Sequence, residues 1–323
     1  MKLPTVIILC PKDFRFTDDE ATVERPHLTG VAALKTVWLD YEAPLPDKVL
    51  EANALILWHG PLLNAEVIGR LRRCRAIIRN GVGYDTVDTA AARQAGIAVC
   101  NVPDYGTEEV ADHAIALTLA LYRQLFPLDA AAKRLDWRIN TAPKMRRLRT
   151  QTFGVIGLGR IGTAAALRAK ALGFRVIFFD PYVKRGVHKA VGVERVETLD
   201  ELLSTADTVS IHCPATEETR GMIGAGEIAR LKPGAFLVNT ARGDIVHKVP
   251  VFEALHSGHL AGAGLDVVEN EPLRTPEEAA TPNLIVTCHA AFCSPEGMVE
   301  MRTTSARIAR AAVLGEPIWN QVN

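Results

Sequence analysis

The chain has 323 residues, of which 48% are hydrophobic and 23% are charged. This length is too great for one ordinary hydrophobic core and predicts two domains. The 37 basic residues balance the 37 acidic ones, so no net charge favours nucleic acid or an anionic membrane as a partner. The six cysteines form no C-x-x-C pair, which is typical of reduced thiols in a cytosolic protein. No apolar run reaches the length of a membrane-spanning helix.

The first third of the chain alternates short β-branched runs with helical segments. A helix that starts after Asn64, a good N-cap residue, lies between the third and fourth of these runs. Such alternation predicts a parallel sheet covered by helices on both faces. The expected strands are 5–9, 35–39, 54–58, 76–80 and 97–101.

A second α/β unit follows. A long helix is predicted from Thr107, whose hydroxyl could cap it, to about residue 125. Beyond a polar stretch at 133–151 the strand pattern restarts, and a final amphipathic helix begins after Ser294 and Pro295. The strands of this second unit are expected in "FGVIGLG", "RVIFFD", "TVSIHCP", "AFLVNTA", "GAGLDVV" and "LIVTCH".

The segment "FGVIGLGRIGTAAALRAKALGFRVIFFD" contains a G-x-G-x-x-G motif at Gly157, Gly159 and Gly162. The motif follows an apolar strand, opens an alanine-rich helix and precedes a second strand, which is the setting that a dinucleotide site requires. The helix N-terminus at Arg160 and Ile161 would offer free N–H groups to phosphates.

Asp180 ends the strand that follows this helix. A carboxylate there can accept hydrogen bonds from both hydroxyls of an adenosine ribose and would repel a 2′-phosphate. The sequence therefore predicts NAD(H) as the cofactor in preference to NADP(H). Lys184 and Arg185, a few residues further on, weaken this preference slightly.

Three polar residues follow predicted strands in the second unit: Arg242 in "NTARGD", Glu271 in "DVVENEP" and His289 in "VTCHAA". Ligands of α/β sheets bind at the carboxyl ends of the strands. A histidine can transfer a proton, a glutamate beside it would orient the ring and favour its charged form, and an arginine can hold a 2-oxo acid. Residue chemistry alone does not separate such a catalytic trio from structural ion pairs.

From about residue 50 to 320 the chain resembles the D-isomer-specific 2-hydroxyacid dehydrogenases, in the branch of the C-terminal-binding proteins and the phosphoglycerate dehydrogenase-like enzymes. The motifs that carry the resemblance are "RNGVGYDTVD", "GIAVCNVPDYGTEEVADHA", "GLGRIG", "HCPATEETRGMI", "LKPGAFLVNTARGDIV", "GAGLDVVENEP" and "NLIVTCHAA".

The resemblance implies an α/β fold of two doubly wound parallel-sheet domains. A flavodoxin-like substrate domain would comprise residues 1–101 and 292–323, and a Rossmann NAD-binding domain residues 102–291. It also implies a homodimer built through the NAD-binding domain, with a small 2-oxo or 2-hydroxy acid as substrate.

The family's catalytic arginine, glutamate and histidine match Arg242, Glu271 and His289. The loop that receives the substrate carboxylate matches Asn80, Gly81, Val82 and Gly83, with Arg242 and Phe292 also lining the substrate. The cofactor-lining positions are the three glycines together with Thr107, Arg160, Ile161, Asp180, Pro214, Thr240, Ala241, Arg242, Asp266 (near the nicotinamide amide) and His289.

Two departures from the family pattern are visible. His247 and Lys248 stand where acidic residues are usual, and Phe292 replaces the tryptophan that C-terminal-binding proteins carry three residues after their histidine. The second change leaves the substrate open. No metal site is expected, because His256 and His259 lack a carboxylate or cysteine to complete one.

The predicted function is that of an NAD(H)-dependent cytoplasmic oxidoreductase acting on a small D-2-hydroxy or 2-oxo acid, with His289 as general acid and base. The alternative from another class is a nucleotide-sensing scaffold, like the corepressor role of C-terminal-binding proteins. A formate or phosphite oxidase is a further enzymatic alternative; glutamine in related formate enzymes at the position of Glu271 counts against formate.

Overall fold

The computed structural model describes residues 3–12, 18, 20–40, 44–138 and 145–323. The chain forms two compact units, one of Met1–Gly106 with Cys293–Asn323 and one of Thr107–Phe292. The expected domain boundaries followed residues 101 and 291. In the structure the chain passes from the first unit to the second after Gly106 and returns after Phe292. Each unit is described by itself.

The first unit contains a five-stranded sheet with the order β2-β1-β3-β4-β5, in which all paired strands are parallel. This is the order of the flavodoxin-like doubly wound fold. The elements are β1 (Thr5–Pro11), α1 (Arg25–Leu28), β2 (Ala33–Leu39), α2 (Asp47–Leu50), β3 (Ala54–Leu57), α3 (Ala65–Arg70), β4 (Ala76–Arg79), α4 (Thr89–Gln94), β5 (Ala98–Cys100) and α13 (Pro295–Leu314).

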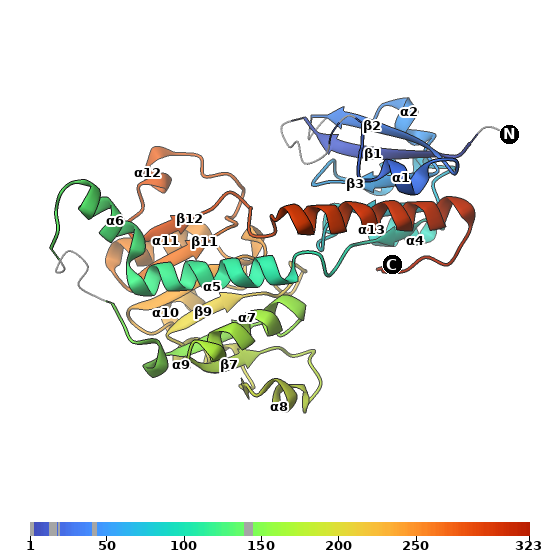
Figure 1. The fold of residues 1–323 in the computed structure, drawn as a ribbon. Coiled ribbons are helices and arrows are strands. Elements are labelled where there is room, and N and C mark those ends of the chain that lie inside the picture. The colour runs from blue at the N-terminus through green and yellow to red at the C-terminus, as the bar shows by residue number, and fades with distance from the viewer. Residues whose placement is uncertain (1–2, 13–17, 19, 41–43, 139–144) are drawn as a thin grey trace. The chain divides into compact units, whose positions relative to one another are not determined.

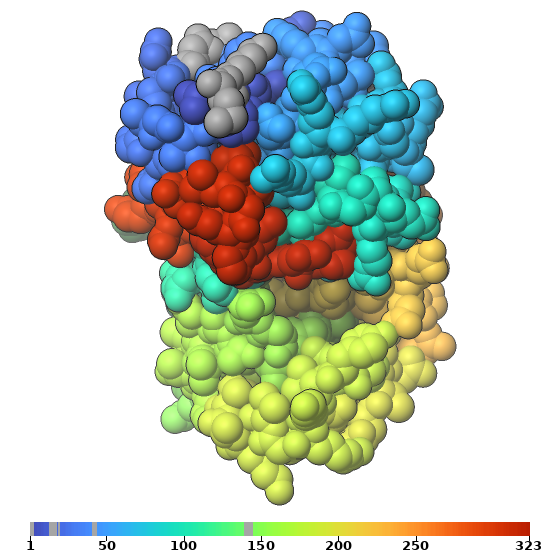
Figure 2. Space-filling model, turned by 90° about the vertical axis from the view of Figure 1, so that its right-hand side faces the viewer, coloured from blue at the N-terminus to red at the C-terminus, as the bar shows by residue number. Residues whose placement is uncertain are grey.

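Helices cover both faces of this sheet. One face packs its alternate apolar side chains, such as Ile7, Leu55 and Ile77, against residues of α2, α3 and α4. The long helix α13 contacts β3, β4 and α1. In Figure 2 the red C-terminal segment accordingly lies beside blue and cyan N-terminal segments of the same unit. Because both faces are covered, the central strands β3 and β4 are apolar except for the terminal Arg79, as expected for a parallel sheet.

The second unit contains a seven-stranded parallel sheet with the order β12-β11-β10-β9-β6-β7-β8. Counted from β6, this is the Rossmann order with one further strand at the edge. The elements are α5 (Thr107–Arg123), α6 (Leu125–Lys133), η2 (Leu148–Thr150), β6 (Thr152–Ile156), α7 (Arg160–Ala171), β7 (Arg175–Phe179), α8 (Val187–Val191), β8 (Glu194–Arg195), α9 (Leu199–Thr205), β9 (Thr208–Ile211), α10 (Ala225–Arg230), β10 (Ala235–Asn239), η3 (Gly243–Ile245), α11 (Lys248–Ser257), β11 (Leu260–Leu265), α12 (Pro276–Ala279) and β12 (Leu284–Val286).

Two apolar layers hold this unit together. On one face α5 and α7 pack on the sheet, with Tyr122 against Phe174 and Phe236 at ring-centroid distances of 5.4 and 4.7 Å. On the other face α9, α10 and α11 pack through residues such as Leu202 and Val251. Figure 1 shows α5 and α7 running beside one another.

The predicted fold class, two doubly wound parallel-sheet α/β domains, is confirmed. The Asn64 and Ser294 caps are also confirmed, because their side chains accept the N–H groups of Val67 and Gly297. The predicted cap at Thr107 is wrong: α5 begins at this residue, and among the described residues its buried hydroxyl has no hydrogen-bond partner. In the parts of the chain that the structure describes, no helix has the length and apolar character to cross a bilayer.

Candidate active site

The glycine loop connects β6 to α7. Gly157 has φ +89°, and a side chain there would place its Cβ 2.8 Å from the backbone nitrogen of Cys213. A Cβ on Gly162 would overlap the carbonyl oxygen of Gly157. Gly159, at the N-cap of α7, has no atom within 4 Å of the position of its missing Cβ. Close packing thus requires glycine at 157 and 162, whereas Gly159 leaves its backbone open to a ligand.

This open approach lies at the N-terminus of α7, where Arg160 and Ile161 are the first helical residues. The first N–H groups of a helix have no intrahelical acceptor, and the helix dipole favours an anion there. The loop therefore has the geometry of a phosphate-binding turn.

Asp180 follows β7 beside this loop. Its carboxylate accepts the N–H of Leu158 at 2.8 Å, that of Tyr182 at 2.8 Å and that of Val183 at 3.1 Å. These bonds fix the carboxylate at the carboxyl edge of the sheet, next to the glycine loop. Arg185, which weakened the predicted preference for NAD(H), pairs with Glu197 at 3.0 Å.

At two further predicted cofactor positions, a buried hydroxyl group lacks a hydrogen-bond partner among the described residues. These are the hydroxyl groups of Thr107 and Thr240. A buried hydroxyl without a partner is costly, so such groups commonly serve a ligand. Pro214 follows β9 and is exposed, and the N–H of Ala241 after β10 donates to the side chain of Asn239 at 3.0 Å. These residues fit a dinucleotide along the edge of the sheet.

The predicted catalytic residues follow three adjacent strands. Arg242 comes after β10, Glu271 after β11 and His289 after β12, and these strands are neighbours in the sheet. The ring Nδ1 of His289 lies 3.0 Å from Oε2 of Glu271. The Arg242 carbonyl is held by the Asn239 side chain at 2.8 Å, and the Arg242 guanidinium donates to the carbonyl of Ala241 at 2.7 Å. The structure thus joins the histidine to the glutamate and places the arginine at the same edge.

His289 has φ +53°, a left-handed conformation that is uncommon for residues other than glycine. Its N–H donates to the carbonyl of Asp266 at 2.8 Å. The carboxylate of Asp266, only 2% exposed as a residue, accepts the N–H groups of Ala290 and Ala291 and the hydroxyl of Thr287. Asp266, predicted near the nicotinamide, therefore holds the turn that presents His289.

His113 on α5 extends this network. Its Nε2 lies 3.0 Å from the Thr287 hydroxyl and 3.7 Å from the Asp266 carboxylate. On the other side of the turn, the rings of Phe292 and His289 meet edge to face at a centroid distance of 6.2 Å. The predicted substrate residue Phe292 is therefore a neighbour of the predicted proton donor.

The loop Asn80–Gly83 follows β4 in the first unit, and donors fix its carbonyl groups. The guanidinium of Arg79 binds the carbonyl of Asn80, the N–H of Val102 binds that of Gly81 at 3.0 Å, and the side chain of Asn101 binds that of Val82 at 2.7 Å.

The N–H groups of residues 81–83 have no acceptor among the described residues. With the carbonyls occupied and the N–H groups free, the loop has the character of an anion-binding nest.

The sequence missed Arg79 and Asn101 as supports of this loop. Arg79 is 5% exposed, and a side chain on Gly81 would collide with its guanidinium. A charged residue at the end of the apolar run "AIIRN" was the available signal, because a buried arginine needs a partner. Asn101 gave no comparable signal.

The remaining histidines that the sequence singled out have ordinary partners. The rings of His256 and His259 bind the carbonyls of Phe252 and Ile228 at 2.8 and 2.9 Å. No group of three potential metal ligands occurs within the described residues. His212, behind the glycine loop, bonds the Ser210 hydroxyl at 2.8 Å, and its burial lowers its pKa from 6.5 to about 4.

The fold and this edge of the sheet define a dinucleotide-binding protein with a histidine–glutamate pair beside the cofactor position. Residues 115–291 match the sequence-family model "D-isomer specific 2-hydroxyacid dehydrogenase, NAD binding domain". The chain belongs to this family of dehydrogenases. The predicted cofactor, NAD(H), is thereby confirmed.

Individual relatives agree with this membership. The chain is 34% identical over 306 residues to C-terminal-binding protein 1 of Caenorhabditis elegans, covering 92% of this chain and 42% of that protein. It is 34% identical over 330 positions to D-3-phosphoglycerate dehydrogenase of Mycobacterium bovis, covering 100% of this chain and 59% of that protein. The chain thus spans less than two thirds of either curated relative.

A solved structure covers nearly the whole chain. D-lactate dehydrogenase from Aquifex aeolicus, in complex with NAD and lactic acid, superposes with a TM-score of 0.87 at 29% identity. The match includes 97% of this chain and 96% of that one.

Proposed function

We propose that the protein is an NAD(H)-dependent oxidoreductase that interconverts a small 2-oxo acid and the corresponding D-2-hydroxy acid. The observation that carries the proposal is the Glu271–His289 hydrogen bond at the carboxyl edge of the NAD-binding domain. The relatives named for phosphoglycerate and lactate support the same class of substrate.

In the direction of reduction, NADH would, when bound, provide the hydride for the carbonyl carbon. The carboxylate of Glu271 accepts a hydrogen bond from Nδ1 of His289, so Nε2 is the ring nitrogen that gives its proton to the carbonyl oxygen. One proton and one hydride are consumed for each hydroxy acid formed. In oxidation, the neutral Nε2 takes the hydroxyl proton back.

The substrate needs two further contacts. Arg242 can bind the carboxylate and the carbonyl oxygen through its planar guanidinium and stabilise the negative charge that develops on that oxygen. The free N–H groups of Val82 and Gly83 bind the carboxylate. Phe292, against the His289 ring, limits the size of the substrate side chain.

The rival proposal is a nucleotide-sensing scaffold with little or no catalysis, supported by the similarity to a C-terminal-binding protein. The two proposals differ in turnover and agree in NADH binding. NADH oxidation is followed by the loss of its absorbance, with glyoxylate, hydroxypyruvate, pyruvate, phenylpyruvate and 4-methylthio-2-oxobutyrate as the oxidants. Turnover of at least one of these acids supports the enzyme, and tight NADH binding without turnover of any supports the scaffold.

The homodimer and the cytoplasmic location are part of the same proposal. Exposed apolar side chains on α6 and just beyond it support an interface in the NAD-binding domain: Leu125, Phe126, Leu135 and Trp137. Sedimentation equilibrium should give twice the mass of the 35.1 kDa chain, and a monomer at micromolar concentration would contradict the dimer.

A further inference from the structure

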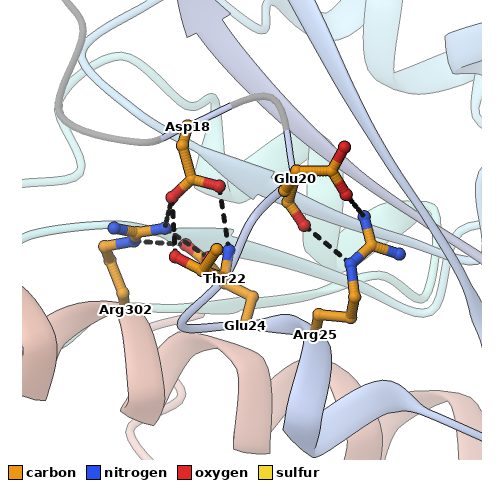
Figure 3. Close-up of polar contacts among 6 residues, drawn as sticks. All are labelled: Asp18, Glu20, Thr22, Glu24, Arg25 and Arg302. Carbon is orange, nitrogen blue, oxygen red and sulfur yellow. Dashed lines mark hydrogen bonds and ion pairs between the residues drawn. The ribbon is translucent and has the colours of Figure 1, made fainter.

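Helix α13 carries two buried polar side chains, Arg302 and Ser305, that bind other parts of the first unit. Nε and Nη2 of Arg302 bind the two carboxylate oxygens of Glu24 at 2.8 and 2.7 Å, and Nη2 also lies 3.3 Å from Asp18 (Figure 3). Glu24 is 0% exposed. A bidentate pair of this kind has a defined geometry, so it fixes how α13 is rotated about its axis.

Ser305 follows Arg302 by one helical turn and reaches the predicted carboxylate loop. Its hydroxyl lies 2.6 Å from Oδ1 of Asn80. This distance suits an O–H···O bond, which is shorter than a typical N–H···O bond. The hydroxyl therefore donates to Oδ1. Both residues are buried, at 0% and 1% exposed.

The Asn80 side chain depends on this one bond. Its Nδ2 has no hydrogen-bond partner among the described residues. Asn80 is the first residue of the loop. Its N–H donates to the carbonyl of Leu57 at 2.8 Å, and its carbonyl accepts a hydrogen bond from the guanidinium of Arg79. Without Ser305, no hydrogen bond to a described residue would orient the side chain at the root of the loop.

We propose that Ser305 is a positioning residue for substrate: through Asn80 it holds the loop whose N–H groups bind the substrate carboxylate. This inference rests on the proposed function. The carboxylate is bound equally in the ground state and in the transition state, because it does not react. Losing its fixed binding loop therefore raises KM and leaves kcat nearly unchanged.

The first test compares Ser305→Ala with the wild type on the best 2-oxo acid of the panel. A buried acceptor left without its donor is costly, so we expect a KM for the acid about 10-fold higher, with kcat and the Kd for NADH within about 2-fold. Alanine is the best helix former, so α13 is expected to stay intact. An unchanged KM, or a loss confined to kcat, would overturn the proposal.

Thr304→Ala is the matched control. Thr304 directly precedes Ser305 on α13, is half-buried and belongs to neither the loop nor the catalytic site. It should keep the wild-type KM. If both variants raise KM equally, the effect comes from the helix in general and the positioning role is refuted.

A double-mutant cycle isolates the pair. Asn80→Ala alone and Ser305→Ala alone should each lower kcat/KM, and the double variant should be no worse than the poorer single variant. This non-additivity is expected of two residues in direct contact. Additive losses would show that the two side chains act independently.

Amide hydrogen exchange separates this inference from the proposed function. In the cofactor-free protein, Ser305→Ala should speed exchange at the two bonded amides that anchor the loop, relative to Thr304→Ala and whatever reaction the protein catalyses. These are the N–H of Asn80, bonded to Leu57, and the N–H of Val102, bonded to Gly81. If no 2-oxo acid is reduced yet this exchange accelerates, the proposed function fails and the positioning of the loop stands. Equal exchange in both variants would overturn the positioning role.

Discussion

His289 shows what a single residue contributes and what its neighbours must supply. The ring Nδ1 bonds to Glu271 at 3.0 Å, but the position of the residue depends on Asp266, which accepts both N–H groups that follow the histidine. The positions after strands made the histidine and the glutamate candidates, and the family resemblance matched them to the family's catalytic residues. The sequence could not identify the positioning role of Asp266, because that role arises from a turn with φ +53° at His289.

Asp180 carries a prediction at the same scale. Asp180→Ala removes the acceptor proposed for the ribose hydroxyls, and hydrogen bonds to a charged group contribute about 1.5–3 kcal/mol. We expect NADH to bind roughly 10–100-fold more weakly, and the preference over NADPH to shrink. Fluorescence titration with each nucleotide measures both effects.

Asp180→Asn serves as the control for the loop itself. Asparagine keeps one acceptor for the N–H groups of Leu158, Tyr182 and Val183 but lacks the charge. It should keep more of the affinity for NADH than alanine does. Wild-type affinity in Asp180→Ala would contradict the assignment of this carboxylate.

A helix, strand or loop could be predicted where the residues that determine it lie within its own short segment of the sequence. The strand–loop–helix unit β6–α7 was recognisable from three glycines: packing requires Gly157 and Gly162, and Gly159 leaves the backbone open. The loop after β4 was recognisable only by resemblance. The anion binding proposed for it depends on Val102, Asn101 and Arg79, which bind its carbonyls from outside the loop.

Two glycine substitutions test the β6–α7 loop. Gly162→Ala forces a methyl group into the carbonyl of Gly157, so it should lower the melting temperature by several degrees and abolish NADH binding. Gly159→Ala meets no atom of the protein, so the cofactor-free variant should melt like the wild type. It should nevertheless bind NADH at least about 10-fold more weakly, because its methyl group occupies the phosphate approach.

Differential scanning fluorimetry and NADH titration distinguish these outcomes. A Gly159→Ala variant with both normal melting and normal NADH affinity would show that the phosphates do not approach this backbone.

At the scale of the whole molecule, the sequence predicted both sheets because the buried parallel strands are short apolar runs between helical segments. It missed β8, whose two residues, Glu194 and Arg195, form an edge strand without an apolar pattern. It also placed the domain crossing five residues before Thr107, since the extended segment after β5 gives no signal for the side to which it belongs.

The pH dependence of stability follows from His212. Its pKa is about 4 in the folded chain, because of burial, and 6.5 as an unperturbed side chain. Between these values the unfolded chain binds a proton that the folded chain does not. The contribution of neutral His212 to the free energy of unfolding is therefore complete above about pH 6.5 and is lost as the pH falls toward about 4.

Urea unfolding of the wild type and of His212→Asn at pH 7.5 and pH 5.0 measures this effect. The free energy of unfolding should fall by about 1–2 kcal/mol more in the wild type than in the variant over this interval. Equal losses in the two proteins would assign the acid sensitivity to other groups.

The central claim is that His289 transfers the proton in a 2-oxo acid reductase. The most direct measurement is single-turnover oxidation of bound NADH by the best acid of the panel in the wild type and in His289→Gln. General acid catalysis typically contributes ~10²–10⁴-fold, so the variant should be slower by that factor while its Kd for NADH stays within about 2-fold. Turnover by His289→Gln at the wild-type rate would contradict the claim.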